Sequence, residues 1–354
     1  MSFYINSNLI AENTKPYFIA DIAANHDGSL DRAKLLIELA AKSGASAAKF
    51  QHFRAEHIVS DHGFKELGSK IAHQSTWSKS VYEVYKEASL PWEWTPILKQ
   101  TADNYGIDFF TAAYDLEAIE FVSKYVSAFK VGSGDINWHE SIQKMIEKNK
   151  PILLATGAST LEEVRQAYNV LAQSNANFAI MQCNTNYSGE LKNIKFSNLL
   201  TLVQFKDLFP NTILGLSDHT PGDVTVLGAI SLGARIIEKH FTDNNERTGP
   251  DHKFSMNPDT WKTMISRSNW LFESLGDGLK KVEENESEAR IVQRRALRFN
   301  AKLSAGHVVS TNDISILRPA PTNSIPPNLL NKIIGRKLNK GVSKDQLVAF
   351  EEFE

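Results

Sequence analysis

The chain has 354 residues, of which 42% are hydrophobic and 23% charged, a balance typical of a soluble globular protein. This length suits a large barrel with a small additional domain. The formal net charge of −2 excludes the chain-wide basic field with which many proteins hold nucleic acid. An anionic ligand would therefore need a local site.

Three further features favour a cytoplasmic protein. The single cysteine, Cys183, excludes a disulfide within the chain, which is typical of a reducing compartment. The N-terminal residues show no basic segment followed by an apolar run, so we expect no signal peptide. No stretch approaches the roughly 18 consecutive apolar residues of a membrane helix. We therefore predict a soluble cytoplasmic protein that binds neither membranes nor nucleic acid.

Short apolar segments alternate with longer amphipathic stretches along most of the chain. Each has the length of a buried parallel strand, about 4–8 residues. In chain order they are residues 18–24, 47–53, 108–114, 128–134, 152–157, 178–184, 213–219 and 236–242.

The stretches between these segments show helical patterns. Residues 30–43 place Leu36, Leu39 and Ala40 on one face and are followed by a glycine, while residues 160–173 begin with a threonine cap and early glutamates. Eight strand–helix units in about 250 residues predict an α/β fold of the (β/α)8, or TIM barrel, type. A doubly wound sheet is the alternative, but no glycine-rich dinucleotide turn follows the first strand.

The strand–helix rhythm stops near Gly278, so we expect a barrel domain over residues 1–279. Residues 280–295 are highly charged and predict a solvated helix or linker. Residues 296–354 contain short β-like pieces with several prolines and glycines, which indicates a second, small domain. A domain of this size gains little stability from its own core, so we expect it to pack on another surface.

Polar residues follow the predicted strands at the end where the catalytic groups of TIM barrels lie. Strand by strand they are Asp21; Lys49 and Gln51; Thr111; Lys130, Ser133 and Asp135; Thr156; Asn184 and Tyr187; Ser217 and His219; and Glu238 with His240. A lysine inside a barrel strand is costly without a partner. Lys49 and Lys130 therefore predict a cradle for a small acid that bears phosphate. The alternative is that each lysine only extends to the surface.

His219 and His240 end neighbouring strands. Two neutral imidazoles at one barrel mouth can share a divalent metal, for which Mn²⁺, Mg²⁺ or Co²⁺ are all suitable. The alternative is a pair of unrelated core histidines. Cys183 lies in an apolar segment and is expected to be inert packing.

Several segments resemble the sialic acid synthase family, which includes N-acetylneuraminate, legionaminate and pseudaminate synthases. They are FIADIAANHDGSLDRAKLLIELAAKSGASAAKFQ, KVGSGDIN, GLSDHTPG, IIEKHFT and GPDHKFS. The tail LRPAPTNSIPPNLLNKIIGRKL resembles the antifreeze-like, or SAF, domain that ends those enzymes. The resemblance extends from about residue 15 to the C-terminus.

This resemblance implies a TIM barrel followed by an SAF domain, in a domain-swapped homodimer. It also implies a metal-dependent enzyme that condenses phosphoenolpyruvate with a 2-acetamido-sugar aldehyde and releases phosphate. We expect the metal to be Mn²⁺. His219 and His240 match the metal ligands, and Arg318 matches an arginine that reaches the partner's active site. Residues that match phosphoenolpyruvate-binding positions are Lys49, Gln51, Thr111, Lys130, Ser133 and Ser217. Asp251 and Tyr187 match residues near the sugar.

We expect Asp21, Lys49, His219, His240 and Asp251 to be catalytic, and Asp135, Thr156 and Asn184 to be further substrate contacts. The chain departs from the family pattern at several positions that surround the acceptor. Asp21 stands where a glutamate is usual, Ala155 where a serine is usual, Ser188 where a proline is usual and Asp135 where a glutamate is frequent. Thr156 could compensate for the missing serine hydroxyl.

Two alternatives to this function remain open. One is condensation of phosphoenolpyruvate with a phosphorylated sugar, against which the SAF-like tail argues. The other is a non-catalytic sugar-binding barrel, against which both lysines and both histidines argue.

Overall fold

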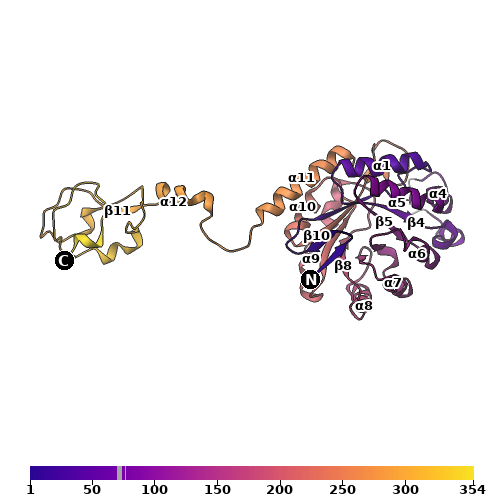
Figure 1. Ribbon diagram of the computed structural model, residues 1–354, viewed down its shortest axis with the longest axis horizontal. Coiled ribbons are helices and arrows are strands. Elements are labelled where there is room, and N and C mark those ends of the chain that lie inside the picture. The colour runs from indigo at the N-terminus through magenta and orange to yellow at the C-terminus, as the bar shows by residue number, and fades with distance from the viewer. Residues whose placement is uncertain (70–73, 76) are drawn as a thin grey trace. The chain divides into compact units, whose positions relative to one another are not determined.

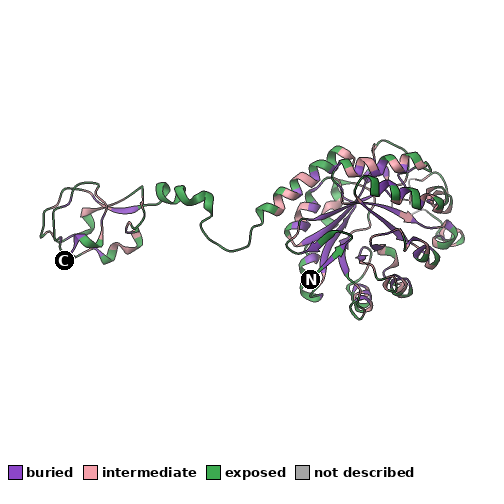
Figure 2. Ribbon diagram, viewed as in Figure 1, coloured by how far each residue is buried: buried purple, intermediate pink, exposed green. Residues whose placement is uncertain are grey.

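The computed structural model describes residues 1–69, 74, 75 and 77–354, and divides the chain into two compact units, Met1–Gly276 and Asp277–Glu354 (Figure 1). The predicted linker, residues 280–295, belongs to the second unit and contains α12 (Ser287–Gln293), whose residues are all exposed (Figure 2). Among the described residues, no helix has both the length and the apolar character needed to cross a membrane.

The first unit is a closed barrel of parallel strands, as the sequence predicts. Strands adjacent in the chain are adjacent in the barrel, and the last pairs with the first, in the order β10-β3-β4-β5-β6-β7-β8-β9. All eight predicted apolar segments form these strands, which confirms the (β/α)8 fold class over the doubly wound sheet. The strands are β3 (Tyr17–Asp21), β4 (Ala47–His52), β5 (Asp108–Ala113), β6 (Phe129–Val131), β7 (Ile152–Ala155), β8 (Phe178–Cys183), β9 (Ile213–Asp218) and β10 (Ala234–His240).

Most of the helices surround the barrel, with their inner faces on the strands and their outer faces exposed (Figure 2). The first helix buries Ala33, Leu36, Ile37 and Ala40 against the strands, and Ser29 caps its start by accepting a hydrogen bond from the backbone of Arg32. The helices are α1 (Leu30–Lys42), α2 (Ala55–Ile58), α3 (Asp61–Glu66), α4 (Val81–Ala88), α5 (Thr95–Asn104), α6 (Leu116–Val122), α7 (His139–Ile146), α8 (Leu161–Ala172), α9 (Thr201–Leu208), α10 (Val224–Ser231) and α11 (Pro258–Ser274).

An N-terminal hairpin of β1 (Ser2–Ile5) and β2 (Asn8–Ala11) closes the N-terminal end of the barrel. Its residues Phe3, Ile5 and Ile10 belong to the same buried cluster as the inward-facing side chains of the strands. The carboxylate of Asp108, at the start of β5, accepts hydrogen bonds from Tyr17 Oη at 2.6 Å and from Asn8 Nδ2 at 3.1 Å. The opposite end, where the strands terminate, is left for the site.

The second unit has a small core of its own. Its antiparallel strands, β11 (Ala296–Phe299) and β12 (Ile314–Leu317), pack with the segments that follow them. The buried residues of this core are Leu297, Phe299, Val309, Ile325, Ile333, Leu338, Val342, Val348 and Phe353. Arg318 follows β12 directly and is exposed within this unit.

Candidate active site

A polar cavity of about 270 Å³ lies at the C-terminal ends of the barrel strands. Because side chains alternate along a strand, residues two apart on one strand point into it together, as Lys49 and Gln51 do on β4. Most of the residues singled out from the sequence line this inner cavity. They are Asp21, Lys49, Gln51, Lys130, Ser133, Asp135, Tyr187, Ser217, His219 and His240.

Two buried lysines share one carboxylate at the floor of the inner cavity. Glu238 Oε1 lies 3.0 Å from Lys130 Nζ and 3.5 Å from Lys49 Nζ, and accepts a hydrogen bond from Ser217 Oγ at 3.2 Å. Lys49 Nζ also lies 2.6 Å from Asp21 Oδ2, its neighbour in the register of β4 and β3. Neither lysine is more than 4% exposed, so neither extends to the surface.

The charges of this cluster are set by their mutual contacts. Burial would lower the pKa of Lys49, but the carboxylates of Asp21 and Glu238 outweigh burial and raise it above its usual value. Burial would raise the pKa of Glu238, but Lys130 and Lys49 hold it at about 2. Burial also raises the pKa of Asp21, the second carboxyl in contact with Lys49. An anionic ligand would therefore meet two ammonium groups beside one firmly ionised carboxylate and one carboxyl whose ionisation burial opposes.

The two predicted metal ligands lie side by side above this cluster. The ring centroids of His219 and His240 are 5.3 Å apart, and the ring of Tyr187 lies 4.2 Å from that of His219. Burial lowers the pKa of each histidine to about 3, so both imidazoles are neutral near pH 7. The structure therefore brings the histidines into one site, against the alternative of two unrelated core residues.

Both imidazoles are suited to binding a metal. His219 Nδ1 lies 2.8 Å from the carbonyl oxygen of Asn184 and must donate to it, which leaves the lone pair on Nε2. His240 Nδ1 is buried without a hydrogen-bond partner among the residues that the structure describes. A divalent metal with small-molecule ligands fits this donor pair. In the described part of the chain, no three or more His, Cys, Asp or Glu side chains are grouped as a protein-only metal site.

Asp251 enters the site from the loop between β10 and α11. Its Oδ2 accepts a hydrogen bond from the backbone of Ala24 at 3.2 Å and lies 3.9 Å from His240 Nδ1. Burial raises the pKa of Asp251 to about 7, so this carboxyl can hold or release a proton near neutral pH.

Asp251 borders a second cavity of about 140 Å³, which Gln51, Tyr114 and His240 line as well. An outer vestibule of about 1020 Å³ follows, and Asn184 lines it together with Thr185 and Lys253. Tyr187 borders all three spaces. The path from solvent to the lysines therefore passes this tyrosine and the carboxyl of Asp251.

The structure places two of the predicted contacts away from the inner cavity. Thr111 Oγ1 lies 2.7 Å from His52 Nδ1, and the His52 ring packs toward Phe121 in the helical layer. Its neighbour Ala112 lines the cavity in its place. Thr156 Oγ1 donates to the carbonyl of Met181 at 3.0 Å, so it does not replace a serine hydroxyl at position 155. Arg318 lies in the second unit, and its role stays a prediction.

Sequence reasoning gave no role to several residues that line the inner cavity. Glu238 was identified as a strand-end residue only, although it lies two positions before His240 on the same strand and so shares its face. Cys183 also lines the cavity, and so is not only inert packing; burial raises the pKa of its thiol. Tyr114 ends the β5 segment, and Tyr85 comes from α4, where no pattern in the sequence indicates that the helix folds over the mouth.

Comparison with known proteins identifies relatives over most of the chain. The sequence pattern of the NeuB family matches residues 36–280. The chain is 31% identical to the N,N'-diacetyllegionaminic acid synthase of Campylobacter jejuni over 338 residues, which cover 94% of this chain and 99% of that protein. It is also 31% identical to the Legionella pneumophila synthase of the same name over 344 residues, 96% of this chain and 94% of that one.

A similar fold occurs in the crystal structure of the N-acetylneuraminic acid synthetase of Leptospira borgpetersenii. The two structures align with a TM-score of 0.72 over 82% of this chain and 95% of that chain, at 23% sequence identity. This likeness concerns the fold alone.

Proposed function

The chain belongs to the NeuB family, and from that premise we propose that it condenses phosphoenolpyruvate with the aldehyde of a 2-acetamido sugar and releases phosphate. The product is a nonulosonic acid, a nine-carbon keto acid of the sialic acid type. The observation that carries this proposal is the pair of buried lysines, Lys49 and Lys130, below two neutral histidines in one cavity.

Phosphoenolpyruvate occupies the inner cavity. Lys49 and Lys130 hold its carboxylate and phosphate and stabilise the negative charge that accumulates there during the reaction. Ser217, Ser133 and Gln51 supply neutral hydrogen bonds around the same anion. C3 of phosphoenolpyruvate forms the new bond to the aldehyde carbon, water adds to C2, and the C2–O bond to phosphate then breaks.

His219 and His240 hold a divalent metal, for which we propose Mn²⁺. When bound, the metal polarises the acceptor aldehyde as a Lewis acid. Tyr187, which packs on the ring of His219, orients the acceptor at the entrance to the inner cavity. Asn184 fixes the tautomer of His219 through its carbonyl oxygen.

The acceptor lies between the inner cavity and the vestibule. Asp251, whose pKa is raised to about 7, binds the acceptor and can move a proton at its carboxyl oxygen. Asp135 and Asp21 line the inner cavity beneath it. Both bacterial relatives compared above are named as legionaminic acid synthases, which supports a diacetamido-trideoxyhexose as the acceptor in preference to N-acetylmannosamine. Asp21, one methylene shorter than the usual glutamate, also favours an acceptor of different shape.

We further propose that the enzyme is a homodimer in which Arg318 of one chain reaches the acceptor in the site of the other. The support is the resemblance of the tail to the SAF domain and the exposure of Arg318 within its own unit. The cytoplasm is the proposed compartment.

A product screen tests the proposed function. The purified chain is incubated with Mn²⁺, phosphoenolpyruvate and, in turn, N-acetylmannosamine, the diacetamido-trideoxyhexoses and a 6-phosphorylated amino sugar, and the products are identified by mass. We expect phosphate release and a nine-carbon keto acid with a diacetamido sugar. Reaction with phosphorylated sugars alone would favour the phosphorylated-acceptor alternative. No phosphate release with any acceptor would favour a non-catalytic barrel.

A further inference from the structure

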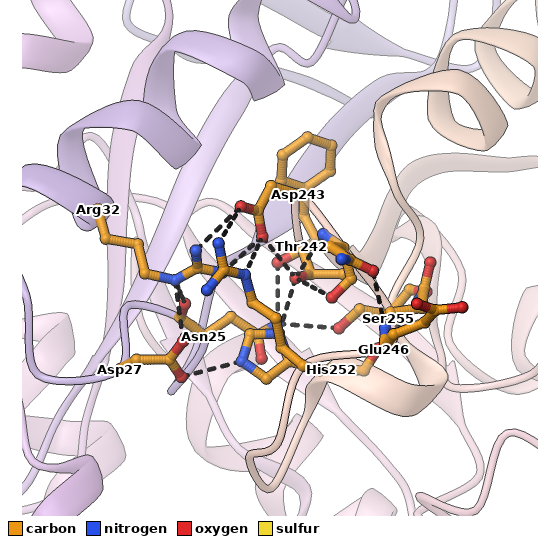
Figure 3. Close-up of polar contacts among 12 residues, drawn as sticks. Asn25, Asp27, Arg32, Thr242, Asp243, Glu246, His252 and Ser255 are labelled. Carbon is orange, nitrogen blue, oxygen red and sulfur yellow. Dashed lines mark hydrogen bonds and ion pairs between the residues drawn. The ribbon is translucent and has the colours of Figure 1, made fainter.

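The loop that carries Asp251 contains a buried histidine, His252, which lines none of the three cavities described above. The side chain of His252 is fully buried and uses both ring nitrogens. Its Nε2 lies 2.9 Å from Asp27 Oδ1, and its Nδ1 lies 2.7 Å from Thr242 Oγ1 (Figure 3). The partners come from two neighbouring strand ends, since Asp27 follows β3 and Thr242 follows β10.

Asp27 is itself fixed by a second set of charges. Its other oxygen, Oδ2, lies 3.0 Å from Arg32 Nε, and the Arg32 guanidinium also contacts Asp243 through two nitrogens, at 2.9 and 2.5 Å (Figure 3). A paired arginine and carboxylate of this kind have a defined mutual orientation. The imidazole of His252 is therefore oriented by groups that belong to two different strand-end loops.

The backbone around Asp251 is fixed at two places, and the first of them is the His252 ring. A Cβ added at Gly249 would come within 2.6 Å of His252 Cδ2, so the chain passes directly over the ring and only glycine fits there. On the other side, Ser255 Oγ donates to the carbonyl of Asp251 at 2.7 Å and accepts from Asn25 Nδ2 at 2.9 Å. Because Asp251 directly precedes His252 and Ser255 fixes only its carbonyl, we expect a shift of the ring to turn the Asp251 carboxyl away from Ala24 N.

We propose that His252 and Asp27 are a positioning pair for Asp251. They fix the direction of the Asp251 carboxyl toward the acceptor and do not contact substrate themselves. A leucine would fill the same buried volume with less desolvation, but it could not fix an orientation by hydrogen bonding. This inference rests on the proposed function, because it requires Asp251 to act on the acceptor.

The test is a double-mutant cycle between His252 and Asp251. We expect His252→Leu to lower kcat on the order of 10- to 100-fold with the KM for phosphoenolpyruvate within about two-fold of wild type, because misplacement by about 1 Å has such effects. In the Asp251→Asn background the same change should have little further effect. His252→Gln, whose amide nitrogen can still donate to Asp27, should recover most of the lost rate.

His52→Leu is the matched control. His52 is equally buried and bonded at both nitrogens, at 2.7 Å to Thr111 and 2.7 Å to Thr95, but it lies outside the cavity. Its effect on kcat should be small and the same in both Asp251 backgrounds, although the melting temperature should fall for both leucine variants.

A crystal structure of the His252→Leu variant supplies a readout that does not need activity. We expect the Asp251 carboxyl to have left Ala24 N. If it stays in place, or if His252→Leu lowers kcat equally in both Asp251 backgrounds, the positioning role is wrong. If His252→Leu does not fold, the milder His252→Gln and Asp27→Ala variants are compared in the same cycle. Absence of phosphate release from wild type would contradict the proposed function, and the crystal structure would still decide the positioning.

Discussion

Lys130 Nζ lies 3.0 Å from Glu238 Oε1, and the contact spans the barrel interior, because β6 and β10 are opposite each other in the closed order of strands. A neutral group at position 238 would leave two buried lysines with only Asp21 to offset them. The energetic consequences of this contact differ between the free and the liganded protein.

We expect Glu238→Gln to lower the free energy of unfolding of the unliganded barrel by about 3 kcal/mol, because it removes the anion from a buried ion pair. Phosphoenolpyruvate should restore part of this loss, since its own negative charge replaces that of Glu238. The measurement is the melting temperature with and without phosphoenolpyruvate. Asp108→Asn, at the closed end of the barrel, is the control that should destabilise without enlarging the ligand-induced shift. If phosphoenolpyruvate raised the melting temperature of both variants equally, the proposed binding of phosphoenolpyruvate beside Glu238 would be wrong.

Lys49→Met and Lys130→Met each remove a buried positive charge and keep most of the side-chain volume. Each should lower kcat/KM for phosphoenolpyruvate on the order of 10²-fold or more, because the charge on the reacting anion loses a fixed partner. Lys239→Met is the matched control. Lys239 is as buried, but it bonds the Thr220 carbonyl at 2.6 Å outside the cavity. That variant should lose stability, followed by circular dichroism, with little change in the KM for phosphoenolpyruvate. Near-normal kinetics in both cavity variants would mean that the phosphate binds elsewhere.

Removal of divalent metal should abolish phosphate release, and Mn²⁺ should restore it. The reason is the pair of neutral imidazoles, His219 and His240, whose ring centroids lie 5.3 Å apart and which both line the inner cavity. Mn²⁺ binding can be followed separately by electron paramagnetic resonance, in which His219→Ala and His240→Ala should weaken the affinity. Full activity in thoroughly metal-free enzyme would be incompatible with this site.

We expect the stability of the Asp135→Asn variant, relative to that of the unliganded wild type, to be greater at pH 8 than at pH 4.5. Burial raises the pKa of Asp135 from 3.8 to about 6, so the folded state binds a proton in that window that the unfolded chain has lost. The contribution of the Asp135 carboxyl to the free energy of unfolding is therefore lost as pH rises through its folded-state pKa of about 6. The variant does not lose it, because asparagine does not titrate. The difference between variant and wild type in urea unfolding should grow by about 2 kcal/mol between the two pH values. Asp31→Asn, at a side chain that is 93% exposed, should show no such change. A pH-independent difference at position 135 would contradict the expected titration.

The proposed dimer predicts complementation between two inactive chains. A Lys49→Ala chain mixed and re-annealed with an Arg318→Ala chain can form heterodimers in which one site keeps both residues. Phosphate release should reappear in this mixture and not in a mixture of two differently tagged Lys49→Ala chains. If heterodimers form without activity, Arg318 acts within its own chain or has no part in the reaction.

The strands could be predicted because each is a buried apolar segment with a polar residue at its end. The direction of the side chains could be predicted where polar residues lie two positions apart on a strand, as Lys49 and Gln51 do. It was not accessible at Thr111, because its neighbours Phe110 and Ala112 share the other face of β5, and the sequence cannot tell whether that apolar pair or Thr111 faces inward. The contact of His252 with Asp27 joins residues 225 positions apart, and only the closure of the barrel brings them together.

In the part of the chain that the structure describes, the hairpin of β1 and β2 covers the N-terminal end of the barrel, and the three cavities of the site lie at the opposite end. Whatever reacts at Lys49 and Lys130 must enter past Tyr187 and must leave by the same route. In the proposed reaction, phosphoenolpyruvate is loaded before the sugar, and the phosphate formed beneath the new keto acid departs last. Inorganic phosphate should accordingly compete with phosphoenolpyruvate for the free enzyme, and its escape past the mouth is a candidate for the slowest event of the cycle.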